Sequence, residues 1–375
     1  MTPDLIVVGG GIIACSAAAY AAERGASVLL LEASEVGAGA SGRNSGSVQY
    51  PFDPILAELH VQTVAAYREL SETTPGFAFP SEPAGLLLLT DDLAAAQHRT
   101  DELARDAPHL APRVLTGESL MAAEPILAPD LAAVSLETGF PIPPDGATAA
   151  MASHARDVGA ELRVGMHVAA IRRDRDRITG VTLRDGTELG GDAVLVAAGP
   201  WSPTLVDPSG AWLPLRPTYG VTVQVQPPSL PRHILEEGVV HTVNQPVEEA
   251  EAGADPSSTF SMISVGATST VGSTFLPGAL EPDEIAPILL RRGARFVPAL
   301  REAAVLRSRV CARPQSIDGR PFIGLWPGTA GLFVCTGHGP WGISTGPASA
   351  ALAVSAILDG DEGGIAPELR AVRAV

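Results

Sequence analysis

The sequence of 375 residues contains no lysine, and its 25 basic residues are all arginines. This absence removes the lysine amine from every catalytic role, including Schiff-base formation and proton exchange by a titrating ammonium. Cysteine is also scarce. There are three cysteines, Cys15, Cys311 and Cys335. An odd number this small does not form the disulfide framework of a small secreted domain.

Positive charge and long apolar runs are lacking as well. The net charge of −17 argues against the basic patch that binding to nucleic acid or to an anionic membrane requires. No apolar run approaches the roughly 18 residues of a membrane span, and residues 1–4 lack the positive charge of a signal peptide. We therefore expect a cytoplasmic protein with no integral membrane segment and no nucleic-acid partner. Its length and hydrophobic content of 46% suffice for one large or two ordinary domains.

The stretch from residue 4 to residue 32 has the order strand, glycine turn, helix, strand, acid. Gly9 makes the tight turn, Gly11 lets the backbone approach a pyrophosphate, and Ala14 keeps the helix close to the sheet. Glu32 follows at the distance where an acid accepts hydrogen bonds from a ribose diol, and it would repel a 2′-phosphate. The pattern predicts bound FAD or NAD.

The segment after Glu32, residues 33–47, is too rich in glycine and serine for a helix and too long for a plain turn. Its backbone N–H groups and hydroxyls suit a polar ligand, and the alternative is a flexible surface loop. Residues 54–72 then have helical apolar spacing. His60 within them is expected to be structural or solvated rather than catalytic.

The rest of the chain returns to the nucleotide fold twice. Residues 192–199 form a buried parallel-type strand that ends in glycine, and a strand at 332–335 precedes a helix at about 344–358. We assign residues 1–75, 141–211 and 311–375 to a nucleotide-binding domain. Residues 76–140 and 212–310, with strands and helices of their own, would build a second domain in two excursions. An acidic loop, 244–258, is expected within the second of these.

Four motifs in this order resemble the D-amino-acid oxidase superfamily of FAD-dependent oxidoreductases, which includes glycine oxidase, sarcosine oxidase and D-amino-acid dehydrogenase. They are Val7-Val-Gly-Gly-Gly-Ile-Ile13, Gly39-Ala-Ser-Gly-Arg-Asn-Ser-Gly46, Val194-Leu-Val-Ala-Ala-Gly-Pro-Trp-Ser202, and Arg313-Pro-Gln-Ser-Ile-Asp-Gly-Arg-Pro-Phe-Ile-Gly324 with Gly337-His-Gly-Pro-Trp-Gly342. The resemblance spans nearly the whole chain. It implies an α/β fold in which an FAD-binding, Rossmann-like domain of the glutathione-reductase type carries a mixed-sheet α+β substrate domain inserted in two excursions.

The resemblance also implies FAD rather than NAD and assigns residues to its parts. The ADP half would be held near the first strand and helix, with Val168 at the adenine. The loop at 41–47 would line the pyrophosphate, ribityl chain and flavin edge, and the turn at 337–344 would face the flavin pyrimidine. The residues implied for the cofactor are Gly9, Gly11, Ile12, Ile13, Glu32, Ala33, Ser41, Gly42, Arg43, Asn44, Ser45, Gly46, Ser47, Val168, Ala198, Gly199, Trp201, Gly337, His338, Gly339, Trp341, Gly342, Ile343 and Ser344.

The reacting end of the site is expected around Arg313, whose counterpart in related enzymes binds the substrate carboxylate. A guanidinium fork matches a carboxylate bidentately, and the alternative is an arginine paired with a core acid. A helix that opens near Ser344 would direct N–H groups and its positive dipole end at the flavin region where charge develops. Tyr50 and Trp341, together with Gln49, are further candidates to reach the substrate, or else belong to the core.

Cys311 lies two residues before Arg313, where sarcosine oxidases carry a cysteine that binds FAD covalently. An inert buried thiol is the favoured alternative. Sarcosine oxidases also use lysines to bind carboxylate and to activate oxygen. Since this chain has none, either Arg43 or His338 supplies the positive charge or oxygen is not the natural acceptor.

These features predict an enzyme that oxidises the C–N bond of a small amino acid or secondary amine by hydride transfer to flavin N5. The product would be an imine, and the acceptor either oxygen or an electron carrier. One alternative is an FAD-binding, electron-passing or structural subunit of a heteromeric oxidase or dehydrogenase, and another is an NAD-dependent dehydrogenase. Whether the chain forms homo-oligomers or binds a partner subunit is left open.

Overall fold

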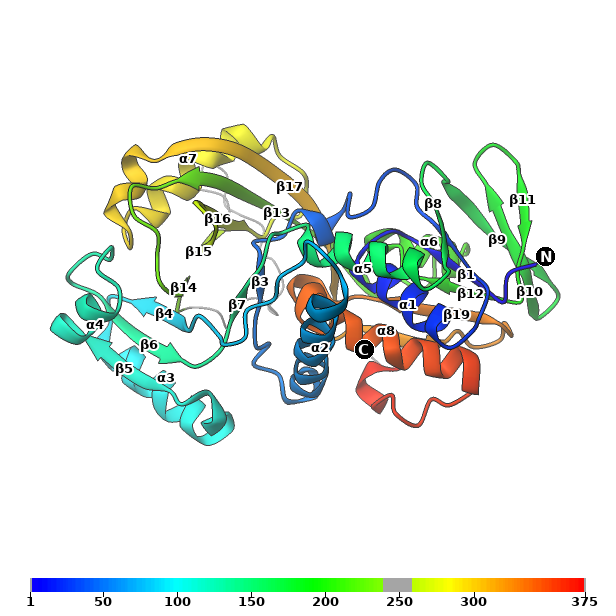
Figure 1. The fold of residues 1–375 in the computed structure, drawn as a ribbon, viewed down its shortest axis with the longest axis horizontal. Coiled ribbons are helices and arrows are strands. Elements are labelled where there is room, and N and C mark those ends of the chain that lie inside the picture. The colour runs from blue at the N-terminus through cyan, green and yellow to red at the C-terminus, as the bar shows by residue number, and fades with distance from the viewer. Residues whose placement is uncertain (1, 239–257, 374–375) are drawn as a thin grey trace.

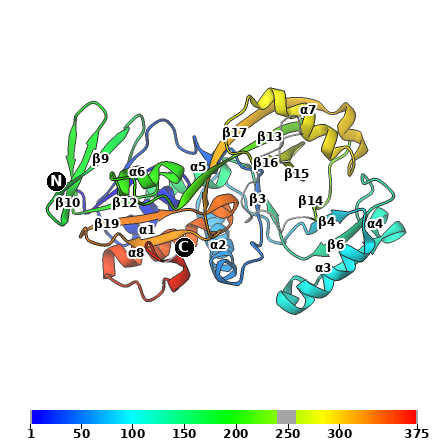
Figure 2. The ribbon, with the colours of Figure 1, turned by 180° about the vertical axis from the view of Figure 1, so that it is seen from behind.

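The computed structural model describes residues 2–238 and 258–373, and two sheets organise this part of the chain (Figure 1). The predicted acidic loop at 244–258 lies outside the described residues except for Ser258. In Figure 1 the two sheets lie at opposite ends of the long axis, with helix α2 between them. The rear view in Figure 2 shows the same division.

A six-stranded sheet holds the first motif at its centre. Its order is β18-β19-β12-β1-β2-β8, and all strands are parallel except β18, which runs antiparallel to β19. Because β1 is central, strands lie on both sides of the glycine turn that follows it. The strands are β1 (Leu5–Val8), β2 (Val28–Leu31), β8 (Glu161–Arg163), β12 (Ala193–Val196), β18 (Phe322–Leu325) and β19 (Leu332–Thr336).

The alternation of side chains along β1 divides the core into two layers. Leu5 and Val7 face one cluster with the helices, whereas Ile6 and Val8 face the other with a three-stranded antiparallel sheet. Because both faces of the sheet are covered, every position of β1 is apolar. The helices are α1 (Ile12–Glu23), α2 (Pro54–Thr73), α5 (Gly146–Asp157) and α8 (Gly342–Asp359), and the small sheet consists of β9 (Val168–Asp174), β10 (Arg177–Leu183) and β11 (Glu188–Gly190).

Helix α8 is the one described helix that is long and apolar enough to cross a membrane by length and composition. It packs against α1 and α2, and about two thirds of its apolar 18-residue window, which lies within Gly339–Asp359, is buried inside the protein. Its apolar character is that of a core helix.

The second sheet has eight strands in the order β17-β13-β16-β15-β14-β4-β6-β5, with β14 and β4 parallel and the other pairs antiparallel. One face packs against α7 (Pro282–Gly293) through side chains such as Val221, Val223 and Met262. The other face turns toward the junction with the first sheet and packs at its far end against α3 (Leu93–Asp106). The strands are β4 (Leu86–Thr90), β5 (Arg113–Thr116), β6 (Ala132–Leu136), β13 (Leu215–Gln226), β14 (Ile234–Glu237), β15 (Ser258–Val265), β16 (Thr268–Thr274) and β17 (Ala304–Ser316).

The remaining described elements are short. A pair of two-residue strands, β3 (Ser47–Val48) and β7 (Phe140–Pro141), lies where the chain passes between the sheets. Helices α4 (Gly117–Ala123) and α6 (Ser202–Val206) follow β5 and β12.

The predicted fold class is confirmed, since a parallel Rossmann-like core and a mixed second sheet are both present. Strand β17 was not predicted. It is 13 residues long and spans the proposed domain boundary at residues 310 and 311. It pairs with β13 along its whole length, so Arg313 belongs to a strand of the eight-stranded sheet.

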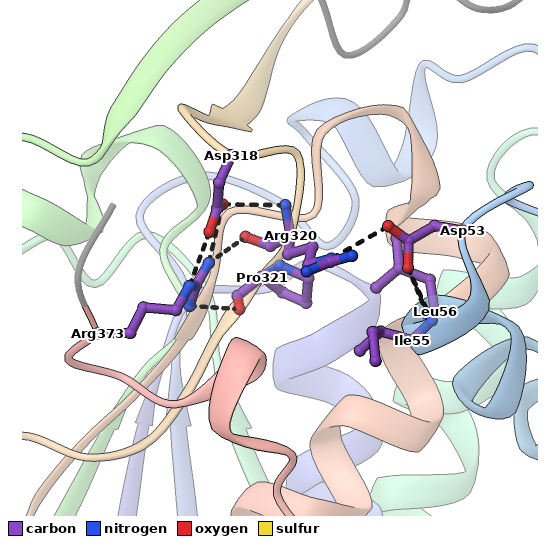
Figure 3. Close-up of polar contacts among 7 residues, drawn as sticks. All are labelled: Asp53, Ile55, Leu56, Asp318, Arg320, Pro321 and Arg373. Carbon is purple, nitrogen blue, oxygen red and sulfur yellow. Dashed lines mark hydrogen bonds and ion pairs between the residues drawn. The ribbon is translucent and has the colours of Figure 1, made fainter.

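A cluster of polar contacts fixes the segment after β17 (Figure 3). Asp318 accepts two hydrogen bonds from Arg373, and Arg320 donates to Asp53, the residue that caps α2 by accepting from the N–H groups of Ile55 and Leu56. The Asp-Gly-Arg part of the fourth motif therefore ties the chain end and α2 to the sheet.

Candidate active site

A cavity of about 700 Å³ opens at the carboxyl ends of the parallel strands. Val8, Leu31, Ala197 and Thr336, which end or follow β1, β2, β12 and β19, all line it. Ligands of open α/β sheets bind at this edge. The cavity continues from Glu32 at one end to Arg313 at the other, so it joins the six-stranded sheet to the eight-stranded one.

The first end is shaped by close backbone packing. Gly9 has φ of +120°, and a Cβ there would meet the carbonyl oxygen of Ala197. A Cβ on Gly10 would lie 2.7 Å from the Cγ of Glu32, so glycine keeps this carboxylate in position. Glu32 Oε1 accepts a hydrogen bond from the backbone of Ser34 at 2.8 Å. The arrangement suits the ribose diol that the sequence predicts there.

The start of α1 offers donors to an anion. Its N-cap, Gly11, supplies no side-chain cap, and the one N–H with a side-chain acceptor is that of Ile12, bonded to Ser41 Oγ at 3.0 Å. Free N–H groups and the helix dipole favour a phosphate at such a terminus. The loop that brings Ser41 is held by Asn44, which donates to the carbonyls of Ser41 and Pro144.

Arg313 lies at the other end. Its guanidinium donates to the carbonyl of Thr274 at 2.9 Å and to Ser273 Oγ at 3.0 Å, and it stacks 4.7 Å from the ring centroid of Phe275. It crosses β13 over Gly220, where any side chain would overlap it. Burial is the main cause that lowers the pKa of Arg313 from its usual range. Within residues 2–238 and 258–373 it has no carboxylate partner, so the paired-core alternative is not what the structure shows.

The turn after β19 places His338 against the same end of the cavity. The side chain is 1% exposed, and neither ring nitrogen has a partner among the described residues. Burial lowers the pKa of His338 to about 3, so the ring is neutral. Helix α8 begins directly after this turn without a side-chain cap, and Gly342 and Ile343 line the cavity. Unpartnered buried donors converge here.

The family model described as "FAD dependent oxidoreductase" matches residues 4–356. The chain belongs to this family. Glycine oxidase from Geobacillus kaustophilus is 29% identical over 92% of this chain and 90% of the relative. A D-amino acid dehydrogenase from Cereibacter sphaeroides is 30% identical over 76% of this chain and 64% of that protein. The crystal structure of glycine oxidase from Bacillus cereus has the same fold, with a TM-score of 0.84 and 24% identity over all of both chains.

The protein is therefore an FAD-dependent oxidoreductase, and the cavity fits the cofactor. The glycine cradle at Gly9 and Gly10, the uncapped α1 and the ribose acid match an ADP half. The orphaned ring nitrogens of His338 and the start of α8, which has no side-chain cap, match the polar edge of a flavin. When bound there, FAD supplies a two-electron acceptor.

The structure brings most of the predicted cofactor residues to the cavity wall. Those that line it are Gly9, Gly11, Ile12, Ile13, Glu32, Ala33, Ser41, Arg43, Asn44, Val168, Ala198, Gly199, Trp201, His338, Gly339, Gly342 and Ile343. The predicted residues that do not line it are Gly42, Ser45, Gly46, Ser47, Gly337, Trp341 and Ser344. The assignments of both groups to FAD stay predictions.

The other predicted substrate residues, Tyr50 and Trp341, are both buried. Tyr50 packs edge-on against Phe52, His60 and His109, and it does not line the cavity. Burial lowers the pKa of His60 to about 4, so this histidine is neutral.

Cys311 lines the cavity beside Arg43, whose carbonyl accepts a weak hydrogen bond from the thiol at 4.0 Å. Burial is the largest influence and raises the pKa of Cys311 despite the nearby arginines. The thiol is therefore protonated and weakly nucleophilic. This favours non-covalent FAD, although the position itself is at the cofactor site.

Sequence reasoning gave no role to Glu236, which is outside the cavity lining but contacts Gln49, one of the predicted substrate candidates. It lies on β14, a strand that was not predicted, and accepts a hydrogen bond from Gln49 Nε2 at 2.9 Å. The sequence around it, Ile-Leu-Glu-Glu, has neither alternation nor a motif. A contact across 187 residues left no signal in the sequence.

Proposed function

We propose that the protein oxidises the C–N bond of a small amino acid or secondary amine to an imine, which water then hydrolyses. The observation that carries this proposal is Arg313, a buried guanidinium held by neutral acceptors at the reacting end of an FAD cavity. A buried cation without a counter-ion is costly, and a substrate carboxylate would offset that cost. The glycine oxidase and D-amino acid dehydrogenase relatives act on substrates of this kind by their names.

Arg313 and the groups that hold it would position the substrate. Arg313 would hold the carboxylate in a fork, and its bonds to Thr274 and Ser273 would fix the plane of that fork. The stack on Phe275 limits rotation of the guanidinium. Fixing the carboxylate sets where the Cα–H points, which is the contribution that a hydride transfer needs from the protein.

For the acceptor we propose molecular oxygen, with an electron carrier as the alternative. Of the two groups considered as a replacement for lysine, His338 is neutral because of burial, which leaves Arg43 at the cavity wall. Location in the cytoplasm, and the question of homo-oligomers or a partner subunit, stay predictions.

Anaerobic reduction of the purified holoenzyme tests the proposal. Glycine, D- and L-amino acids and N-methyl amino acids would each be added while the visible flavin absorbance is recorded. Matched carboxylic acids without nitrogen serve as controls. At least one amino acid or amine should bleach the flavin and the controls should not. If dithionite bleaches the flavin and no candidate does, oxidation of amino acids and amines by the isolated chain is wrong.

An aerobic peroxide assay and an anaerobic dye-coupled assay of the same substrates would separate the two acceptors. Peroxide formed at the rate of substrate loss supports oxygen. Turnover only with the dye supports an electron carrier.

A further inference from the structure

Two adjacent glutamates on β14, Glu236 and Glu237, face opposite sides of the eight-stranded sheet. Glu237 accepts two hydrogen bonds from Arg292 of α7, each 2.8 Å, and one from the N–H of Phe260. Its charge is thereby paired on the α7 side. Glu236 points to the other face, and among the described residues its one hydrogen-bond partner is Gln49.

That other face is the one that carries Arg313. Directly opposed residues of paired strands share a face, and Glu236 stands in register with Ser261, then Gly272, then Thr222. Thr218 of β13 lies four residues before Thr222, so it shares the same face, and its partner on β17 is Arg313. A Cβ on Gly272 would lie 3.6 Å from Ser45 Oγ, so this face abuts the cofactor loop.

The separation of the two charges fits a small amino acid. The guanidinium of Arg313 reaches β16, where it binds Ser273 and Thr274. Glu236 stands on β14, two strands away. Two strand spacings are about 10 Å, and a hydrogen bond at each end takes up about 3 Å. Glu236 is in register with Gly272, two residues before Thr274, so the two charged ends lie across and slightly along the same face, at a spacing on the scale of one small zwitterion.

Gln49 holds the Glu236 carboxylate and ties it to the flavin end of the site. Its Nε2 donates to Glu236, its Oε1 accepts from Ser47 Oγ at 3.3 Å, and its backbone N–H donates to Ser344 Oγ at 2.9 Å. Ser344 lies in the first turn of α8, next to the cavity-lining Ile343. The carboxylate is thus held in position relative to that helix start.

Burial raises the pKa of Glu236 to about 7, and the hydrogen bond from Gln49 opposes the shift only in part. Neighbouring β4 and β15 present Leu88 and Ser261 to it, which do not titrate in this range. Among the described residues, the titratable and charged groups on this side include Tyr50 after β3, His60 and His109 packed on that ring, Arg43, and Arg309, Cys311 and Arg313 on β17.

We propose that Glu236, held by Gln49, binds the substrate's amino group and accepts the proton that this group must lose before its C–N bond is oxidised. The proposal rests on the proposed function and adds a residue to it. An ammonium has no lone pair to stabilise the positive carbon that hydride loss creates. One N–H proton therefore moves to the Glu236 carboxylate, leaving the neutral amine. Hydride loss from Cα to FAD then forms the C=N bond, and the carboxyl group returns its proton to solvent.

The variant Glu236→Gln tests this, since it keeps the shape and the bond from Gln49 but cannot take a proton. The rate of anaerobic flavin reduction divided by substrate Kd would be measured against pH. In the native enzyme it should fall about tenfold per pH unit below pH 7. In the variant it should be about 100-fold lower at pH 7, and its acid limb should move up toward the pKa of the free substrate amine. An unchanged limb near pH 7 overturns the proposal.

A binding measurement separates this role from a structural one. A carboxylic acid without nitrogen, titrated against the flavin absorbance, should bind Glu236→Gln as tightly as the native enzyme, because it contacts Arg313 alone. Equal loss of affinity for the carboxylic acid and for the amino acid would show general damage and overturn the role. The matched control is Glu237→Gln on the opposite face, which should keep the native pH profile.

A second variant keeps the proposal testable if Glu236→Gln does not fold. Glu236→Asp retains the acid but withdraws it by one methylene, so it should keep an acid limb while losing roughly tenfold in rate. A native rate in Glu236→Asp overturns the proposal. If the native enzyme is reduced by no amine at any pH, the proposed function fails instead, and that result is distinct from a reducible enzyme whose variants behave like the native one.

Discussion

Arg313 shows how one side chain can depend on several distant segments. Its cation is held by a backbone carbonyl, a hydroxyl and an aromatic face, all neutral, from residues 273–275. Gly220 leaves the space that it crosses. Because the chain lacks lysine, arginine is the residue available for a fixed positive charge, and its fork suits a carboxylate better than an ammonium does.

We expect Arg313→Ala to retain FAD and to lose a few kcal/mol of transition-state stabilisation, mainly as a higher KM, because a buried charge pair with the substrate is removed. Arg313→Lys should restore part of the loss, since it keeps the charge without the bidentate geometry. Steady-state kinetics with the best substrate measures both. The control is Arg295→Ala, which breaks an exposed pair with Asp91. Native kinetics in Arg313→Ala would contradict the carboxylate role.

At the scale of elements, the segment between β17 and β18 depends on an ion pair whose arginine is nearly buried and whose aspartate side chain is 28% exposed. The Arg373 side chain is 8% exposed, binds Asp318 through two nitrogens at 2.8 and 2.9 Å, and donates to the carbonyls of Arg320 and Pro321 (Figure 3). It also donates to the carbonyl of Arg370. Burial alone would raise the pKa of Asp318, but the bonds from Arg373 and from the N–H of Arg320 outweigh it, and the pKa is lowered.

We expect Arg373→Ala to lower the free energy of unfolding by about 2 kcal/mol at neutral pH, because it removes the two hydrogen bonds to Asp318 and those to the carbonyls of Arg320, Pro321 and Arg370. A lowered folded-state pKa contributes stability that is present above the unfolded value of about 3.9 and is lost as pH falls through the folded one. The difference between the two proteins should therefore shrink below about pH 4. Urea unfolding at several pH values measures it.

The control for this prediction is Arg24→Ala, which removes a half-exposed pair with Asp359 and should cost less than about 1 kcal/mol. If Arg373→Ala and Arg24→Ala lower the free energy of unfolding equally, the Arg373–Asp318 ion pair stabilises the fold no more than a surface pair does.

At the scale of the whole molecule, the cofactor cavity joins the two sheets. Its wall includes Gly9, Glu32 and Ala198 from around the six-stranded sheet and Cys311 and Arg313 from the eight-stranded one. A ligand that contacts both sheets stabilises their arrangement by mass action, since the unfolded chain has no such site.

We expect removal of FAD to lower Tm. Relative to holoenzyme with free FAD at a thousand times its Kd, the free energy of unfolding should fall by about 4 kcal/mol. Because burial keeps the Cys311 thiol protonated, denaturation should release all flavin into the supernatant. Calorimetry and the absorbance of the filtrate measure the two effects. Flavin that stays with the denatured chain would contradict non-covalent binding, and Cys311→Ser would then identify the link.

The sequence by itself determined the nucleotide half of the molecule. The elements from Leu5 to Glu32 are adjacent in the chain, and their glycines and acid act through local backbone geometry, so the pattern could be recognised without the fold. The family motif likewise singled out Arg313, which lines the cavity, although it did not predict the strand that carries it. Pro314 and the charged arginines around it argued against a strand, so β17 was not predicted. A proline is tolerated there because β17 lies at the edge of the sheet.

Only the tertiary structure decided what surrounds the substrate. Glu236, Gln49 and Ser344 come from three segments far apart in the chain, and nothing in the sequence of any of them records the others. Sheet register placed Glu236 on the same face as Arg313, and a shift of one residue along β14 would turn Glu237 there instead. Local chemistry can fix a cofactor turn, whereas the reacting end of this site depends on contacts that exist only after the two sheets have packed together.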